Sequence, residues 1–211
     1  LYAAVDMSTL DETVGRPNPK PHAGIDAAEL VRIMLARGAN PNLTLKAPVL
    51  ERIHNDGDTN LGDGATPLMR AAKDADVPVM RALLDAGADV DARTKVGKTP
   101  LMFAASRLGG FPGTPNRGAE QDAPGGTALS LDRGAAMDAT DQNGQTALHL
   151  SVAQAEDSIV RLLADKGANL QAKDKQGRTP LDLATAGGRG RGAANQRKAA
   201  LLQELLAMIV K

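Results

Sequence analysis

Apolar residues in this chain form short clusters with helical spacing, separated by polar stretches. One pair of clusters is Ala147–Leu150 and Ile159–Leu163. Leu148, Ile159, Leu162 and Leu163 are predicted to face neighbouring helices. Helices this short are not stable alone, so the pattern predicts helix pairs that are stabilised by stacking.

A longer apolar stripe closes the chain. It predicts a final helix at about residues 194–210, with a polar back that is typical of a terminal cap. The stripe consists of Leu201, Leu202, Leu205, Leu206 and Ile209.

Two sequence fragments each occur four times along the chain, and the spacing of 33 residues recurs for both. Thr-Pro-Leu or Thr-Ala-Leu begins at Thr66, Thr99, Thr146 and Thr179, at spacings of 33, 47 and 33. Gly-Ala begins at Gly38, Gly87, Gly134 and Gly167, at spacings of 49, 47 and 33. Where Pro follows, the threonine predicts a helix N-cap, and each glycine predicts a left-handed residue after a helix. A 33-residue unit therefore recurs, and one copy carries 14 extra residues.

The repeated pattern Asp-x-x-Gly-x-Thr-Pro-Leu, an apolar helix and Gly-Ala-Asp-Val-Asp-Ala resembles the ankyrin repeat. Residues 61–93, 141–173 and 174–184 match closely, and residues 94–140 match at both ends. The resemblance implies an all-α solenoid of stacked helix-turn-helix units with β-hairpin fingers.

We expect a single ankyrin-repeat domain over residues 1–211. Its units are about 1–44 with an insertion at 7–26, a finger insertion at 43–60, then 61–93, 94–140 with an insertion at 108–126, 141–173, and a cap at 174–211. Leu1–Ala4 resembles the interior of a repeat. We therefore expect the C-terminal part of a longer array, with any targeting signal out of view and the compartment unpredicted.

The third unit departs from the others in its second helix. Pro124, Gly125 and Gly126 are predicted to shorten this helix, and Ser130 replaces an apolar residue. We expect it to be the least stable repeat. The insertions leave two interpretations open, tolerated surface loops and partner-binding segments.

Composition narrows the function. Lys and Arg number 25, as do Asp and Glu, and the three aromatic residues are Tyr2, Phe103 and Phe111. A nucleic-acid partner is therefore not expected, and no apolar run predicts a membrane span. Only Arg189, Arg191, Arg197 and Lys198 form a basic cluster, which is either a solvated linker or a contact for RNA or an acidic partner.

No motif predicts an enzyme, a cofactor or a small-molecule substrate. The chain has no cysteine, which excludes thiolate chemistry. Asp56–Leu61 begins like a calcium loop but lacks the glycine and the glutamate that such a loop needs, so no metal site is expected. His149 occupies the histidine position of the repeat, which implies a structural role.

The ankyrin resemblance implies a non-catalytic scaffold for a protein partner whose identity is unknown. By that resemblance, the partner contacts the finger tips and the first helix of each repeat. The corresponding residues are Asp63, Lys73, Asp74, Lys95, Lys98, Ser106, Arg107, Gln142, Asn143, Gln145 and Gln154. The alternative is a constitutive structural subunit of a larger assembly or fibre.

Overall fold

The computed structural model describes residues 1–8, 27–46, 61–106, 119–154, 157–186 and 192–209. Within these ranges every regular element is a helix. The helices are α1 Tyr2–Ser8, α2 Ala27–Ala36, α3 Pro67–Lys73, α4 Val77–Asp85, α5 Pro100–Ala105, α6 Ala119–Asp132, α7 Ala147–Gln154, α8 Asp157–Asp165, α9 Pro180–Thr185 and α10 Gly192–Ile209.

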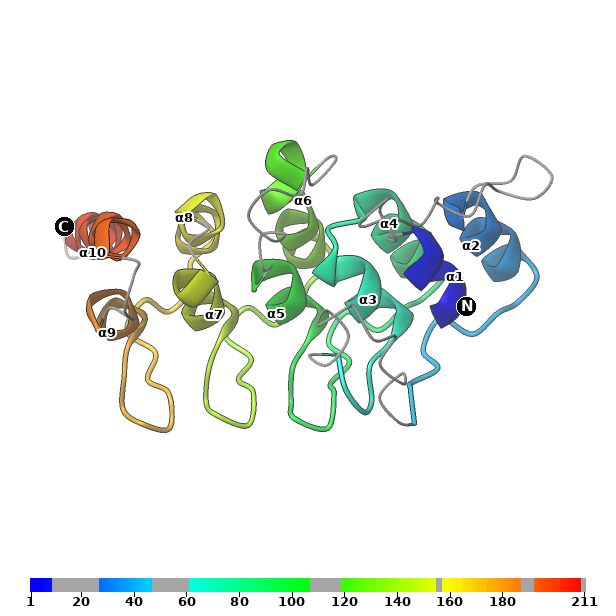
Figure 1. Ribbon diagram of the computed structural model, residues 1–211, viewed down its shortest axis with the longest axis horizontal. Helices are drawn as coiled ribbons and strands as arrows, with labels where there is room; N and C mark the ends of the chain where they lie inside the picture. The colour runs from blue at the N-terminus through cyan, green and yellow to red at the C-terminus, as the bar shows by residue number, and fades with distance from the viewer. Residues whose placement is uncertain (9–26, 47–60, 107–118, 155–156, 187–191, 210–211) are drawn as a thin grey trace.

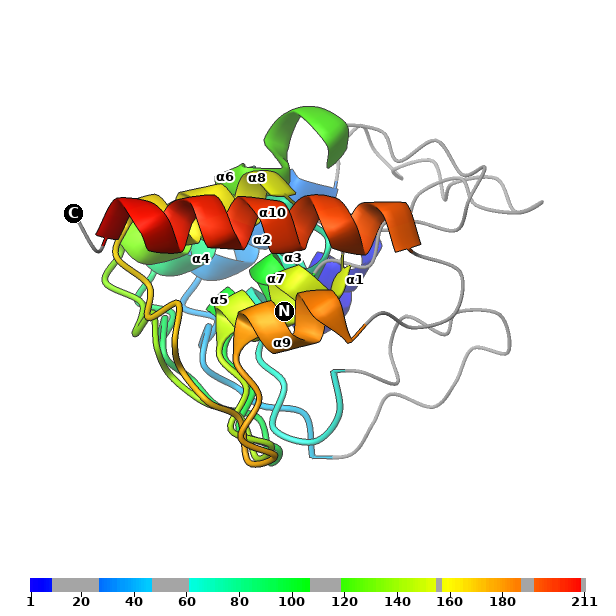
Figure 2. The ribbon, with the colours of Figure 1, turned by 90° about the vertical axis from the view of Figure 1, so that its left-hand side faces the viewer.

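The helices form two rows (Figure 1). The odd-numbered helices, α1 to α9, make a first row, and the even-numbered helices, α2 to α10, make a second row above it. Each helix contacts its pair and its neighbours in the same row. The end-on view shows the connecting loops projecting together at one side of the first row, and these loops are called the fingers below (Figure 2).

Threonine side chains start three helices of the first row, as predicted. Thr66, Thr99 and Thr179 each accept a hydrogen bond from the backbone N–H three residues later. In each case proline follows at the start of the helix, where no backbone donor is lost.

Glycine follows the second helix of four repeats, α2, α4, α6 and α8, which is also as predicted. Gly38, Gly87, Gly134 and Gly167 have φ of 85°, 86°, 87° and 94°. In this region a Cβ atom is strained, so glycine allows the chain to turn back toward the next finger.

The apolar core extends along the stack in two clusters that meet at α5. Phe103 and Ala104 belong to the first cluster, and Leu101 and Met102 belong to the second. Leu163 is fully buried in the second cluster. Leu162 is only partly buried, which corrects the expectation that it faces the neighbouring repeats.

The expectation of a shortened second helix in the third unit is wrong. Helix α6 runs from Ala119 to Asp132 with Pro124 inside it, so it includes part of the expected insertion 108–126. Gly126 is buried, and a Cβ atom added there would lie 3.2 Å from Met80 Sδ, which is tighter than most such contacts. The missing side chain therefore lets α4 and α6 approach closely.

One of the two buried hydroxyl groups within α6 is accommodated by the helix itself, and the other, that of Thr127, has no hydrogen-bond partner among the described residues. The Ser130 hydroxyl donates to the Gly126 carbonyl at 2.9 Å, and Leu129 belongs to the first core cluster. Tertiary packing therefore keeps helical a segment whose sequence disfavours it.

The fingers contain no strand within the described ranges, so the β-hairpin part of the expected fold is not confirmed. Two backbone hydrogen bonds close each of three fingers. In the first of them the N–H group donates to a carbonyl four residues later, from Thr94 to Lys98, Asp141 to Gln145 and Asp174 to Arg178, each at 3.0 Å, and in the second the glycine of the turn donates back to the same threonine or aspartate. The expected insertions at 7–26 and 43–60 lie mostly outside the described residues.

Candidate partner-binding surface

Neighbouring fingers are joined to one another through their backbones. The Lys95 N–H donates to the Asp63 carbonyl, Gln142 to Val96, and Lys175 to Asn143, each at 2.9 Å. The three bonds connect equivalent positions of four successive fingers. We call this set the finger ladder.

The first of these fingers has a further backbone partner. Leu45 donates to the Ala65 carbonyl and accepts from the Gly64 N–H, both at 2.9 Å. Leu45 also packs against the first core cluster. The start of the expected 43–60 insertion is therefore attached to the finger row.

Glycine at the finger turn permits the close approach of the next finger. Gly64, Gly97 and Gly144 have φ of 84°, 80° and 76°. A Cβ atom on Gly144 would lie 2.9 Å from Lys175 N, closer than real Cβ contacts. The repeat pattern requires glycine here for two physical reasons, conformation and space.

The side chains at the finger tips take little part in holding the stack. Gln142 and Asn143 are exposed, Gln145 is half-exposed, and within the described residues none of these amide groups has a hydrogen-bond partner. Their backbone groups carry the turn and the ladder instead. These three predicted site residues therefore lie together on one finger turn with their amides open to solvent.

Charged residues occupy the neighbouring fingers. Lys95 pairs with Asp63 across two fingers, and Lys98 Nζ lies 5.8 Å from the centre of the Phe103 ring. Lys95 remains well exposed within its pair, so its ammonium group is open to a partner. Exposed pairs of this kind add little to stability.

The predicted residues at the ends of the first helices have structural partners. Asp74 follows α3 and pairs with Arg70, and the Ser106 N–H donates to the Met102 carbonyl at 2.8 Å as α5 ends. Lys73, the last residue of α3, is half-buried. Arg107 lies outside the described residues, as does the side chain of Gln154.

His149 has the structural role that the sequence implied. It is fully buried, Nδ1 lies 2.9 Å from Thr146 Oγ1, and Nε2 lies 3.2 Å from the Arg178 carbonyl. The ring therefore ties the start of α7 to the next finger.

Two carboxylates organise the last finger and the helix after it. Burial alone would raise the pKa of Asp174, but hydrogen bonds from the Arg178 side chain and backbone, together with its charge, hold the pKa below its ordinary value. Hydrogen bonds from the Thr179 backbone and hydroxyl lower the pKa of Asp182 in the same direction. Both carboxylates are therefore ionised at neutral pH. Their hydrogen-bond partners lie within the same finger and helix start, so no bound ligand is needed to explain the two charges.

The expected basic cluster is partly wrong. Lys198 is buried and its Nζ donates to the Val152 carbonyl near the end of α7, whereas Arg197 is exposed. Lys198 therefore joins α10 to α7 and is not available to a partner. Arg189 and Arg191 lie outside the described residues.

Other kinds of site find no support in the part of the chain that the structure describes. No group of three or more His, Asp or Glu side chains is placed to hold a metal ion there, and Asp56 lies outside it. No helix in those ranges is long and apolar enough to span a bilayer.

The paired helices, the two rows and the laterally joined fingers define a helical repeat protein with a row of adjacent loops along one side. The family model described as ankyrin repeats (3 copies) matches residues 23–111 and 121–202. The chain therefore belongs to the ankyrin repeat family, whose members generally bind other proteins and are typically not enzymes. A search of the curated proteins found no match to the chain.

Proposed function

We propose that this protein is a non-catalytic scaffold that binds a protein partner through the fingers and the ends of the first-row helices. The observation that carries the proposal is that, in the fingers, backbone atoms hold the structure together while the side chains at the tips are left open to solvent. Backbone atoms form the ladder, whereas the Gln142, Asn143 and Gln145 amides are left without partners in the described structure. A surface held rigid by its backbone loses little conformational entropy when a partner binds.

The mixed chemistry of this surface favours a polar partner surface. Amide side chains donate and accept, and Lys95 and Lys98 add positive charge, with Lys95 paired to Asp63. Such a surface can match many proteins, so its composition supports a protein partner and leaves its identity to experiment.

A triple variant tests the proposal. Lys98→Glu, Gln142→Glu and Gln145→Glu change the charge of three finger positions without touching the backbone ladder. Proteins that co-purify with the native chain are first identified by mass spectrometry, and the affinity for the purified partner is then measured by calorimetry. We expect the triple variant to bind at least about tenfold more weakly.

The matched control places the same chemical changes on α10. Gln196→Glu, Arg197→Glu and Gln203→Glu likewise convert one cation and two amides, at exposed positions on the cap. The control should bind as the native chain does. Equal weakening in both variants, or unchanged binding in the fingertip variant, would contradict a role for the fingers.

The competing proposal is a constitutive subunit of a larger assembly or fibre. It predicts that the purified chain elutes only with its neighbours on size exclusion, whereas a scaffold elutes alone and gains mass when its partner is added. The exposed polar residues Gln203 and Glu204 on the outer face of α10 favour the scaffold, whereas the exposed Met208, one turn after Glu204, adds apolar surface that a next subunit could cover.

A further inference from the structure

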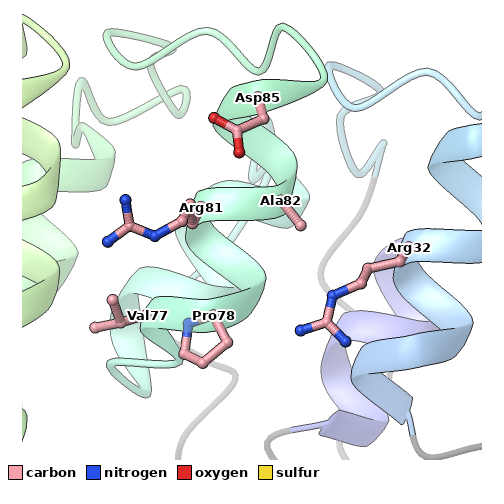
Figure 3. Close-up of a pocket in the computed structure, with 6 residues that line it drawn as sticks. All are labelled: Arg32, Val77, Pro78, Arg81, Ala82 and Asp85. Atoms are coloured by element: carbon pink, nitrogen blue, oxygen red, sulfur yellow. The ribbon is translucent and has the colours of Figure 1, made fainter.

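A second surface lies on the outer helices, away from the fingers. It is a groove of about 570 Å³ along the exposed side of α4, bounded on one side by α2. Figure 3 shows Arg32 extending from α2 toward Pro78, and Arg81 extending from α4 on the side away from α2. A peptide bound across α4 would therefore have the Arg32 guanidinium on the α2 side of the helix and the Arg81 guanidinium on the opposite side.

The middle of this groove is lined by small apolar side chains. Pro78 and Ala82 lie between the two arginines, and Val77 lies beside Arg81 on the side of α4 away from α2. Pro78 is exposed and the other two are partly buried, so small apolar side chains of a bound segment have a surface to cover.

Positive charge is in excess along the lining of the groove. Arg81 is exposed and has no ion pair among the described residues, while Arg32 pairs with the exposed Glu29 at 3.2 Å. Asp85, the one carboxylate of the lining, already pairs at 2.6 Å with Arg133 of the next repeat. The lining therefore offers one unpaired guanidinium group, that of Arg81, and a second, that of Arg32, whose only ion pair among the described residues is solvent-exposed. Its one carboxylate is already paired, although the whole chain has no net charge.

The same position in another repeat lacks this excess. Arg32, Arg81 and Arg161 each stand six residues before the glycine that follows their helix. On α8, however, Asp157 and Asp165 stand four residues before and four residues after the arginine. On α4 only the second of these two positions is acidic, and on α2 neither is. An arginine at this position is thus a common feature of the outer row. It has two aspartates four residues away on α8, one on α4, and on α2 only Glu29 three residues earlier.

We propose that the groove along α4 binds an acidic peptide segment of a partner protein. Its carboxylates pair with Arg32 and Arg81, and a small apolar residue between them covers Pro78 and Ala82. Arginine suits this role because its planar fork can hold a carboxylate through two hydrogen bonds. The proposal is independent of the finger surface, since no residue belongs to both.

A peptide-binding measurement on the full chain tests the proposal. The probe is a fluorescein-labelled peptide of alternating Glu and Ala, followed by fluorescence anisotropy at low ionic strength, where charge pairing is least screened. A peptide of alternating Lys and Ala is the control probe. We expect the acidic peptide to bind and the basic peptide not to bind.

Variants separate the groove from general attraction to positive charge. The double variant Arg32→Glu and Arg81→Glu should weaken binding of the acidic peptide by at least about tenfold. Arg161→Glu, the same change at the equivalent position outside the groove, should alter it by less than about twofold. Ala82→Gln keeps the charge but fills the apolar middle of the groove, and it should also weaken binding.

Three results would overturn the proposal: no binding of the acidic peptide to the native chain, undiminished binding to the Arg32 and Arg81 double variant, or equal loss in the Arg161 variant. Helical circular dichroism of each variant confirms that the fold is retained.

Discussion

At the scale of single residues, the finger glycines show how one sequence position serves two purposes. Gly144 and Gly177 occupy the same place in adjacent fingers, with φ of 76° and 75°. A Cβ atom on Gly144 would meet the next finger at 2.9 Å from Lys175 N, whereas a Cβ atom on Gly177 would meet nothing within 4 Å. Both glycines are therefore required by the left-handed backbone, and Gly144 is in addition required by the lack of space for a side chain.

Gly144→Ala should therefore destabilise the protein more than Gly177→Ala. Both variants strain a left-handed residue, at a cost of about 1–2 kcal/mol, but only the first forces two fingers apart and weakens the bond from Lys175 to Asn143. Urea unfolding followed by circular dichroism measures both free energies. Equal losses would mean that the fingers move apart at no cost.

Lys198 illustrates where reasoning from single residues fails. Neighbouring positive residues suggested a solvent-exposed cluster, yet Lys198 is buried and its amine donates a hydrogen bond to the Val152 carbonyl near the end of α7. Whether Lys198 is buried depends on which face of α10 packs against the other helices, and the sequence alone does not show this orientation. Charge in the sequence does not report burial, so only the packing of α10 revealed this role.

At the scale of elements, α9 depends on an ionised carboxylate for its start. Asp182 accepts hydrogen bonds from both the backbone N–H and the hydroxyl of Thr179 at 2.7 Å. These bonds hold the pKa of Asp182 below its ordinary value in the folded state. Its contribution to stability is therefore fully present above the ordinary carboxyl pKa and is lost as the pH falls through the folded value.

Acid titration should show this dependence. The free energy of unfolding of the native chain should decrease as the pH falls from about 5 to 3, and Asp182→Asn should flatten part of that decrease because no proton is then taken up at this site. Urea unfolding at each pH provides the comparison. An unchanged slope in the variant would show that Asp182 does not couple protonation to folding.

Helix α6 marks the limit of prediction for elements. The 33-residue period located the threonine caps and the glycine turns, because these depend on local backbone chemistry. The period could not locate the start of α6, because the packing of Gly126 against Met80 involves a residue of the preceding repeat. Likewise, the unpaired amides of Gln142 and Gln145 became evident only when the turns were in place.

At the scale of the whole molecule, α10 closes one end of the stack. Leu201, Leu202 and Leu205 are buried in the second core cluster, while Gln203 and Glu204 face outward. The apolar stripe predicted from the sequence is therefore confirmed for these three leucines, and Leu206 is only partly buried.

A chain that ends at Ala186 should lose much of its stability. Each buried leucine contributes about 2 kcal/mol, and their removal exposes the apolar sides of α8 and α9. We expect a lower urea midpoint and binding of an apolar dye. A chain that ends at Leu206 keeps the buried leucines and should behave as the native chain does; similar losses in both truncations would contradict the capping role.

The finger ladder has a consequence for how this protein can change over generations. Its bonds join backbone N–H and carbonyl groups, which every residue except proline supplies in full. Substitutions at Gln142 or Asn143 can therefore accumulate with little effect on the alignment of the repeats. If the tips bind a partner as proposed, recognition can change by substitution there while the alignment of the repeats stays constant.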